Sequence, residues 1–299
     1  MKVVPGKGKM ANLNVTSVYK VAREVRGGDD TPVNVVLAGD RAAALAALLG
    51  GGSANAEPDA LRVLPHGSGS DLSKDDIVVL LADDAGAEAI IGAVRRARAK
   101  LVVVVPPAGG SAAHEAARRA GAYDDELVFA DPATPWATPK LADAVARTAG
   151  QRGPTLASRL PAVRDAVVRR LVRHVARQNA AVGVVIWVPG ADMPVMTLNQ
   201  VRMVLQIGAA YGEDVGPQRA PEVLTVVGAG LGLRTAAREA LGFVPVAGWA
   251  VKGAMGYAGT LALGRAAVKY YESGAVPVDP SRVKGLLNKV ARRGKVKAD

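Results

Sequence analysis

The chain has 299 residues, of which 49% are hydrophobic but only 4% are aromatic. A core of this composition must be built mainly from Ala, Val and Leu, which suits helices and parallel strands better than an aromatic-rich β-sandwich. The absence of cysteine excludes disulfides and thiolate metal sites. The histidines, His66, His114 and His174, are far apart in the sequence, so we expect no His-rich metal site.

The positive charge is concentrated in the second half of the chain. Residues 1–150 carry 17 Lys and Arg against 18 Asp and Glu, whereas residues 151–299 carry 21 against 9, and the whole chain has a net charge of +11. Such asymmetry indicates an anionic partner for the second half, either a membrane surface or nucleic acid. The alternative is a set of arginine-rich helix faces that meet only solvent.

The predicted elements of the first half alternate between strands and helices. A helix is predicted over residues 15–26 and is stopped by the glycines that follow. Apolar runs predict strands at 33–38, 61–64, 76–83, 101–105 and 126–130, with helices at 41–49, 87–99, 111–120 and 139–148. Because the strands lack polar alternation, we expect them to be buried on both faces of a mostly parallel α/β sheet.

Strand signals stop at Gly150, and the rest of the chain is predicted to be all helical. Helices are expected at 155–187, 197–211, 220–228, 231–241, 247–272 and 281–292, with Thr197 as a cap. We therefore divide the chain into an N-terminal tail and helix (1–32), an α/β domain (33–150), and a helical domain with a basic C-terminal tail (151–299).

The first strand is followed by a glycine and a helix, the order in which a P-loop fold begins. A working phosphate loop needs G-x-x-x-x-G-K-S/T, whose Lys reaches the phosphates and whose hydroxyl holds Mg²⁺. Counting from Gly39, the second Gly, the Lys and the Ser/Thr are replaced by Ala44, Leu45 and Ala46. We therefore predict a degenerate loop that binds no nucleotide, and we expect no cofactor, metal or catalytic residue.

The order of elements over residues 33–150 resembles a GTPase domain that has lost its motifs, a pseudo-GTPase with a P-loop GTPase-like sheet. Where a GTPase carries Asn-Lys-x-Asp, the chain has Pro106-Pro107-Ala108-Gly109 after the strand at 101–105. Asp83 could be assigned as a Mg²⁺ ligand, but a carboxylate at a strand-to-helix turn explains it equally well. A flavodoxin-like domain remains the alternative, since every doubly wound fold alternates in this way.

The second half carries a more specific resemblance. Residues 155–273 are similar to the YcjF-like domain of unknown function, a helical module often fused behind a GTPase domain in bacteria. The similarity is carried by Leu160–Arg164, Ala176–Ala180, Gly190–Pro194, Leu198–Met203, Ala210–Gly212 and Gly259–Arg265. The resemblance implies association with membranes and assigns no catalytic residue.

Basic residues of this half supply the candidate contact with an anionic surface. Arg170, Arg173, His174 and Arg177 share one face of a predicted helix, and Arg164 lies one turn or two before them. The tail forms a second basic, amphipathic segment. The candidate contact residues are Arg164, Arg170, Arg173, Arg177, Lys289, Arg292 and Arg293.

Two further features of the second half have open alternatives. Gly256, Gly259, Ala262 and Ala266 are spaced as a small-residue helix face, suited either to a membrane helix or to a tightly packed soluble hairpin. The charges nearby favour the hairpin, although Leu241–Gly264 approaches a spanning segment. Asn199, Gln200 and Arg202 could bind a polar ligand or hydrogen-bond the loop before them.

These observations predict a non-enzymatic scaffold or regulator at or near the inner membrane surface. We expect a cytoplasmic location, since the start of the chain lacks the apolar segment of a signal peptide. A partner GTPase, another protein or an anionic membrane surface are the expected partners, and the oligomeric state is open. A nucleic-acid-binding module is the alternative, weakened by the lack of aromatic side chains beside the basic residues.

Overall fold

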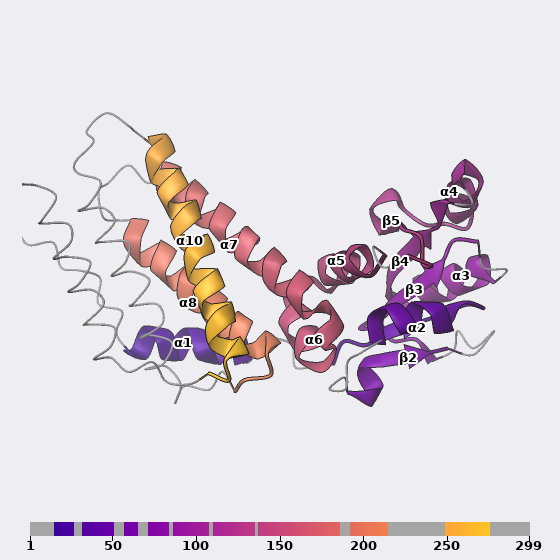
Figure 1. Ribbon diagram of the computed structural model, residues 1–299, viewed down its shortest axis with the longest axis horizontal. Helices are drawn as coiled ribbons and strands as arrows, with labels where there is room; N and C mark the ends of the chain where they lie inside the picture. The colour runs from indigo at the N-terminus through magenta and orange to yellow at the C-terminus, as the bar shows by residue number, and fades with distance from the viewer. Residues whose placement is uncertain are drawn as a thin grey trace, which may run out of the picture. The chain divides into compact units, whose positions relative to one another are not determined.

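The computed structural model describes residues 15–26, 32–50, 57–64, 71–83, 86–107, 110–134, 137–185, 192–214 and 249–275. The chain forms two compact units, which are described separately below and can be traced in Figure 1. The α/β unit comprises Gly28–Arg170 and Ala209–Glu213, and the helical unit comprises Met1–Gly27, Leu171–Gly208 and Asp214–Asp299. The predicted domain division at residue 150 stays a prediction, whereas the compact units divide after Arg170.

The α/β unit is built on a five-stranded parallel sheet with the order β2-β1-β3-β4-β5. All residues of β1 and β3 are buried, because both faces of the sheet are covered. This sheet confirms the predicted α/β class. The strands are β1 (Val35–Leu37), β2 (Leu61–Val63), β3 (Ile77–Leu81), β4 (Lys100–Val105) and β5 (Leu127–Phe129).

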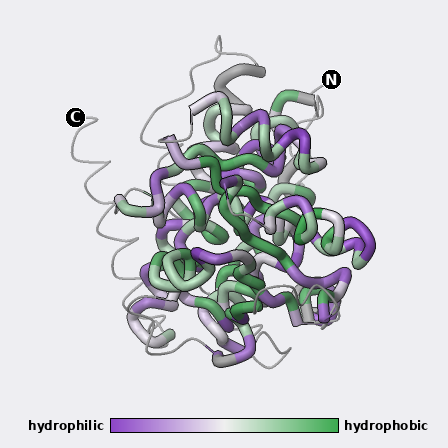
Figure 2. The backbone as a smooth tube through the Cα atoms, turned by 90° about the vertical axis from the view of Figure 1, so that its right-hand side faces the viewer, coloured by the Kyte–Doolittle hydropathy of each residue, from purple (hydrophilic) through white to green (hydrophobic). Residues whose placement is uncertain are grey.

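Four helices cover the sheet, two on each face. α3 and α4 pack on one face through a cluster that includes Ile91, Val94 and Ala117. α2 and α5 contact each other and pack on the opposite face. The helices are α2 (Ala42–Gly50), α3 (Ala87–Ala97), α4 (Gly110–Arg119) and α5 (Ala137–Ala149), and α6 (Gly153–Arg159) follows after a 3₁₀ turn. Figure 2, in which the α/β unit faces the viewer, shows hydrophobic strand segments at the centre of this unit.

The strand order 2-1-3-4-5 is that of flavodoxin-like doubly wound folds, the alternative considered from the sequence. The direction of winding reverses between β1 and β3, so a ligand would be expected beyond the carboxyl ends of these two strands. The narrower interpretation of the sheet as GTPase-like stays a prediction.

After α6, the described helices of the second half are α7 (Arg164–Val185), α8 (Asp192–Ala210) and α10 (Trp249–Glu272), and α1 (Val15–Arg26) also belongs to the helical unit. The predicted helix 155–187 is interrupted at Leu160-Pro161, where a 3₁₀ turn separates α6 from α7. The predicted cap at Thr197 is wrong: α8 begins at Asp192, and Pro194 is accommodated in its first turn. The helices predicted at 220–228, 231–241 and 281–292 lie outside the described residues.

Glycines of α10 let it approach α7 very closely. A Cβ atom on Gly264 would lie 2.5 Å from Val172 Cγ1, and one on Gly256 would lie 2.8 Å from the Asn179 carbonyl oxygen. The predicted small-residue face is therefore only partly right, because Gly259 is half-buried and Ala262 and Ala266 are exposed. The packing face of α10 is formed by Gly253, Gly256, Thr260, Leu263, Gly264, Ala267 and Tyr271.

None of the helices in the described ranges is long and apolar enough to cross a membrane. The first part of the segment Leu241–Gly264 lies outside those ranges, and the remainder belongs to α10.

Candidate functional site

The carboxyl ends of β1 and β3 are where a doubly wound fold would bind its ligand. β1 leads through Gly39, with φ +98°, into Asp40 and Arg41, and β3 leads to Asp83. The guanidinium of Arg41 forms an ion pair with the Asp83 carboxylate, and both side chains are partly exposed. The cation nearest to the switch point is thus already engaged by a carboxylate.

The substituted positions of the degenerate loop, Ala44, Leu45 and Ala46, lie inside α2. Leu45, which stands at the position of the phosphate-binding Lys, is fully buried in the core, whereas Ala44 is exposed and Ala46 is half-buried. An apolar side chain directed into the core cannot replace an ammonium that reaches a phosphate. Within the described ranges, no group of three or more His, Cys, Asp or Glu side chains could hold a metal ion.

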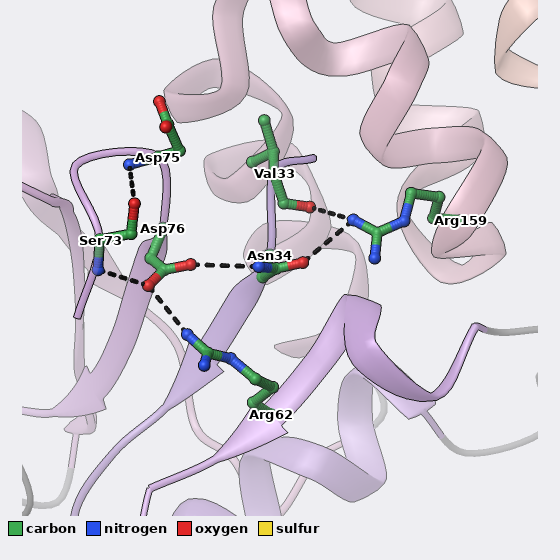
Figure 3. A network of polar contacts seen from close by, with 7 residues as sticks. All are labelled: Val33, Asn34, Arg62, Ser73, Asp75, Asp76 and Arg159. Atoms are coloured by element: carbon green, nitrogen blue, oxygen red, sulfur yellow. Dashed lines mark hydrogen bonds and ion pairs between the residues drawn. The ribbon is translucent and has the colours of Figure 1, made fainter. Parts of the chain in front are cut away.

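At the opposite side of the sheet, where the amino ends of the strands lie, there is a buried polar network (Figure 3). We call this side the amino edge of the sheet. Asp76, directly before β3, has a side chain that is 1% exposed. Its carboxylate accepts hydrogen bonds from Asn34 Nδ2 (3.3 Å), Arg62 Nη2 (2.9 Å) and the Ser73 backbone N–H (2.8 Å). These three donors satisfy the buried charge and join β2 to the segments that precede β1 and β3.

Arg159, at the end of α6, extends this network. Its Nη1 donates to the Val33 carbonyl oxygen and to Asn34 Oδ1, both at 3.0 Å, and its Nε donates to Glu57 Oε2 at 2.6 Å. Figure 3 shows Asn34 between Arg159 and Asp76. A residue of the basic second half therefore stabilises the amino edge of the sheet and is unsuited to an external anion.

Two further cations at this edge are also engaged. Arg152 Nη1 pairs with Asp75 Oδ1 at 2.7 Å, and Lys100 Nζ donates to the Thr148 carbonyl oxygen at 2.8 Å. Burial, followed by repulsion from Arg152, lowers the pKa of Lys100, and Asp75 offsets part of this effect. Sequence reasoning missed the whole network, although Asp75-Asp76 immediately before an apolar strand was a usable signal.

The basic face of α7 is formed by Arg170, Arg173 and Arg177, whose side chains are exposed together with His174. Among the ion pairs of the described part of the chain, none involves these three arginines. They lie at positions i, i+3 and i+7, so they share one side of the helix. We call this row the α7 arginine row.

Arg164 does not belong to that row, although the sequence grouped it there. Its Nε donates to the Ala210 carbonyl oxygen at 2.9 Å, and its guanidinium lies 5.0 Å from the centre of the Tyr211 ring. A cation in this position satisfies a free carbonyl at the end of α8. Arg169 also has a partner: its Nη2 forms an ion pair with Asp143 Oδ1 at 2.7 Å. Lys289, Arg292 and Arg293 lie outside the described residues.

A neutral polar network lies inside the helical unit. Asn179 and Thr260 are fully buried, and Gln200 is 3% exposed. Thr260 Oγ1 accepts hydrogen bonds from Asn179 Nδ2 (2.9 Å) and Gln200 Nε2 (3.3 Å) and donates to the Gly256 carbonyl oxygen (2.7 Å). Asn199 Nδ2 donates to Asn179 Oδ1 at 3.0 Å.

These contacts match neither of the two sequence interpretations of Asn199, Gln200 and Arg202. The amides bond to α7 and α10 instead of the preceding loop, and Arg202 pairs with Glu24 of α1 at 2.8 Å. The network fixes the register of three helices, because sliding one of them would leave buried donors without acceptors. It is satisfied internally and holds no group directed to a ligand.

Comparison with known proteins gives one match, which covers part of the chain. The family model of a domain of unknown function (DUF697) matches residues 147–275. No curated protein and no solved structure matches the chain. The expected similarity of the second half to a domain of unknown function is thus confirmed, whereas its link to YcjF and to a GTPase domain stays a prediction.

Proposed function

We propose that this chain is a non-catalytic scaffold or regulator whose pseudo-GTPase α/β unit binds no nucleotide and whose helical unit contacts an anionic membrane surface. The observation that carries the proposal is the position of Leu45, which is buried in the core where a phosphate-binding Lys would stand. A partner GTPase remains an expectation from the family resemblance alone.

The electrostatics of the β1–β3 switch point support the first part of the proposal. The phosphates of a nucleoside triphosphate at this point would lie near the carboxylates of Asp40 and Asp83. Arg41 is already paired with Asp83. Binding would have to break that pair and bury phosphate charge beside an acid, without a Lys or Mg²⁺-binding hydroxyl in compensation.

Calorimetry with GTP and GDP in the presence of Mg²⁺ tests this part. We expect no binding heat at micromolar nucleotide. Micromolar binding that Arg41→Ala abolishes would place nucleotide at the switch point and overturn the proposal. Arg96→Ala, which removes an exposed arginine elsewhere on the α/β unit, is the matched control.

The α7 arginine row supports the second part. Its three guanidinium groups are exposed on one side of one helix and form no ion pair with the described residues. Each basic residue close to an anionic membrane contributes about 1 kcal/mol, so the row is worth roughly 3 kcal/mol, or on the order of a hundredfold in affinity.

Co-sedimentation with vesicles tests the row. We expect binding to vesicles of phosphatidylglycerol mixed with phosphatidylcholine and none to pure phosphatidylcholine. The triple variant Arg170→Gln, Arg173→Gln and Arg177→Gln should lose most of this binding. The control triple Arg96→Gln, Arg118→Gln and Arg119→Gln removes the same charge from exposed positions of the α/β unit and should bind normally.

Equal losses in both triples would show that only net charge matters and would remove the row from the proposal. Duplex DNA offered in competition distinguishes the other anionic partner. Preference for DNA, with a steep dependence on salt, would replace the membrane by nucleic acid.

A further inference from the structure

The ends of three helices converge at one end of the helical unit. A Cβ atom on Gly253 would lie 2.9 Å from Val184 Cγ2, and Gly256 lies against both Asn179 and the Met196 side chain. The last turns of α7 therefore lie beside the first turns of α8 and α10. At the other end of the bundle, Gly264 lies against Val172 and Gly208 lies against Tyr271. α10 is thus antiparallel to α7 and parallel to α8, as Figure 1 also shows.

A charge-free segment runs along each of the three helices near this end of the bundle. Residues 178–184 of α7, 195–201 of α8 and 253–264 of α10 contain no Asp, Glu, Lys or Arg. The first charged residue that follows these segments, moving towards the other end, is an arginine on each helix: Arg177, Arg202 and Arg265. Asp192 and Lys252 lie nearer the helix ends, and their side chains lie outside the described part.

Apolar side chains are exposed within the charge-free segments. Val184 is 37% exposed and Val195 is 44% exposed, and both are among the few large hydrophobic residues of the described chain that reach the surface. Ala181, Ala254, Ala258 and Ala262 are exposed as well. We call this surface, formed by the charge-free segments of α7, α8 and α10, the apolar end.

We propose that the apolar end enters the interfacial region of an anionic bilayer, with Arg173 and Arg177 of α7 at the level of the lipid headgroups. The inference rests on the proposed membrane contact and specifies which part of the chain meets the lipid. It requires no spanning helix, in agreement with the absence of one among the described residues.

The dimensions of α7 fit this arrangement. At a rise of 1.5 Å per residue, Arg177 lies about 10 Å along the helix from Val184, and Arg173 about 16 Å. Apolar segments of interfacial proteins are buried ~5–10 Å into the headgroup and acyl boundary. With the end of α7 directed into the bilayer, Val184 at this depth places Arg177 among the headgroup phosphates. The long stem of Arg173 allows its guanidinium to reach the same layer.

Charge complementarity selects lipid as the occupant. On α7 the apolar end is bordered by exposed Arg177, and the exposed row continues with Arg173 and Arg170. Arg265 of α10 lies further from this end, near the level of Val172. An apolar surface with a basic border matches the depth profile of an anionic bilayer, in which apolar chains lie beneath negatively charged headgroups.

Single-cysteine labelling tests the proposal directly, because the natural chain contains no cysteine. Nitroxide labels are placed on the full chain at Val184→Cys and Ala258→Cys of the apolar end, and at Ala112→Cys of α4 as the control. All three positions are exposed, and Val184 also contacts Gly253 of α10. Accessibility to oxygen and to a water-soluble relaxation agent is measured with and without phosphatidylglycerol-containing vesicles.

We expect the labels at 184 and 258 to lose at least fivefold in accessibility to the water-soluble agent when vesicles are added, and the label at 112 to stay unchanged. Vesicle binding without immersion of 184 and 258 overturns the inference while leaving the proposed membrane contact intact. Absence of vesicle binding for the unlabelled chain overturns both. If the labels at 184 and 258 are already much less accessible than the label at 112 in the absence of vesicles, they are covered by a protein partner, such as a second copy, and the inference is also overturned.

Discussion

The α/β unit and the helical unit bury polar groups in opposite ways. The sheet unit buries charge: Asp76 is held by Arg62, Asn34 and a backbone N–H, and Arg159 and Arg152 close the same edge. The helical unit buries neutral amides and a hydroxyl, Asn179, Gln200 and Thr260, whereas Arg173, Arg177 and Arg265 of its described part are exposed.

The difference follows from what each network joins. Strand amino ends come from distant parts of the chain, and long charged side chains can span the gaps between them. Helices that approach through glycine leave no room for such side chains, so short neutral groups set their register. Arg62, Arg152 and Arg159 of the α/β unit thus serve its structure, whereas Arg173 and Arg177 of the helical unit form no ion pair with the described residues.

The largest expected effect comes from removing the buried carboxylate of the α/β unit. Asp76→Ala leaves Arg62, Asn34 and the Ser73 N–H without their acceptor, which should destabilise this unit by about 3 kcal/mol. Hydrogen exchange resolved by segment is the suitable measurement, because the two units need not unfold together. Asp59→Ala, at an exposed carboxylate, is the control and should change stability by less than about 0.5 kcal/mol.

The next effect concerns the glycine contact of the helical unit. An added methyl at Gly264 would overlap Val172, a β-branched residue whose side chain has one preferred rotamer in a helix. Gly264→Ala should therefore cost about 1–3 kcal/mol of helical-unit stability, measured by denaturant titration.

The same chemical change at Gly92 of α3 should stabilise by up to ~1 kcal/mol, because the added methyl meets only the end of the flexible Arg96 side chain. Val172→Ala combined with Gly264→Ala should recover part of the loss. Equal effects at the two glycines would contradict close packing of α10 on α7.

The neutral network predicts an effect of similar or smaller size. Thr260→Val keeps the shape of the side chain but leaves the buried amide donors of Asn179 and Gln200 without their acceptor, at a cost of about 1–3 kcal/mol. Thr260→Ser retains the hydroxyl and should lose less. If Thr260→Ser were the more destabilising of the two in thermal unfolding, the methyl group rather than the hydrogen bonds would set the register.

The smallest expected effect separates Arg164 from the α7 arginine row. Arg164→Gln loses the bond to the Ala210 carbonyl and the contact with Tyr211, and we expect about 1 kcal/mol lower stability. Vesicle binding should be unchanged, in contrast to Arg173→Gln. A loss of vesicle binding as large as that of Arg173→Gln would show that Arg164 contributes to the contact with the anionic surface.

Much of the fold follows from local patterns. The strands of the sheet and the bounds of α1 were predicted to within a few residues, because uninterrupted apolar runs and glycine stops are short-range signals. The loss of the phosphate-loop motif could also be recognised from the sequence, since the motif requires three residue types at fixed spacing. The interruption of the helix at Pro161 was missed. The start of α8 at Asp192 was also missed, because the residues around Pro194 are compatible both with a loop and with a first helical turn.

The sequence by itself determined the α/β-then-helical order, the lack of a phosphate loop and the concentration of positive charge in the second half. Only the tertiary structure decided which arginines are free. Spacing along one helix placed Arg164 with Arg170 and Arg177, but its partner is a carbonyl 46 residues away. The same holds for Arg159, whose partners lie 102 to 126 residues earlier. A local pattern specifies the face of a helix on which a side chain lies, whereas the group that meets this face is set by the packing of the whole chain.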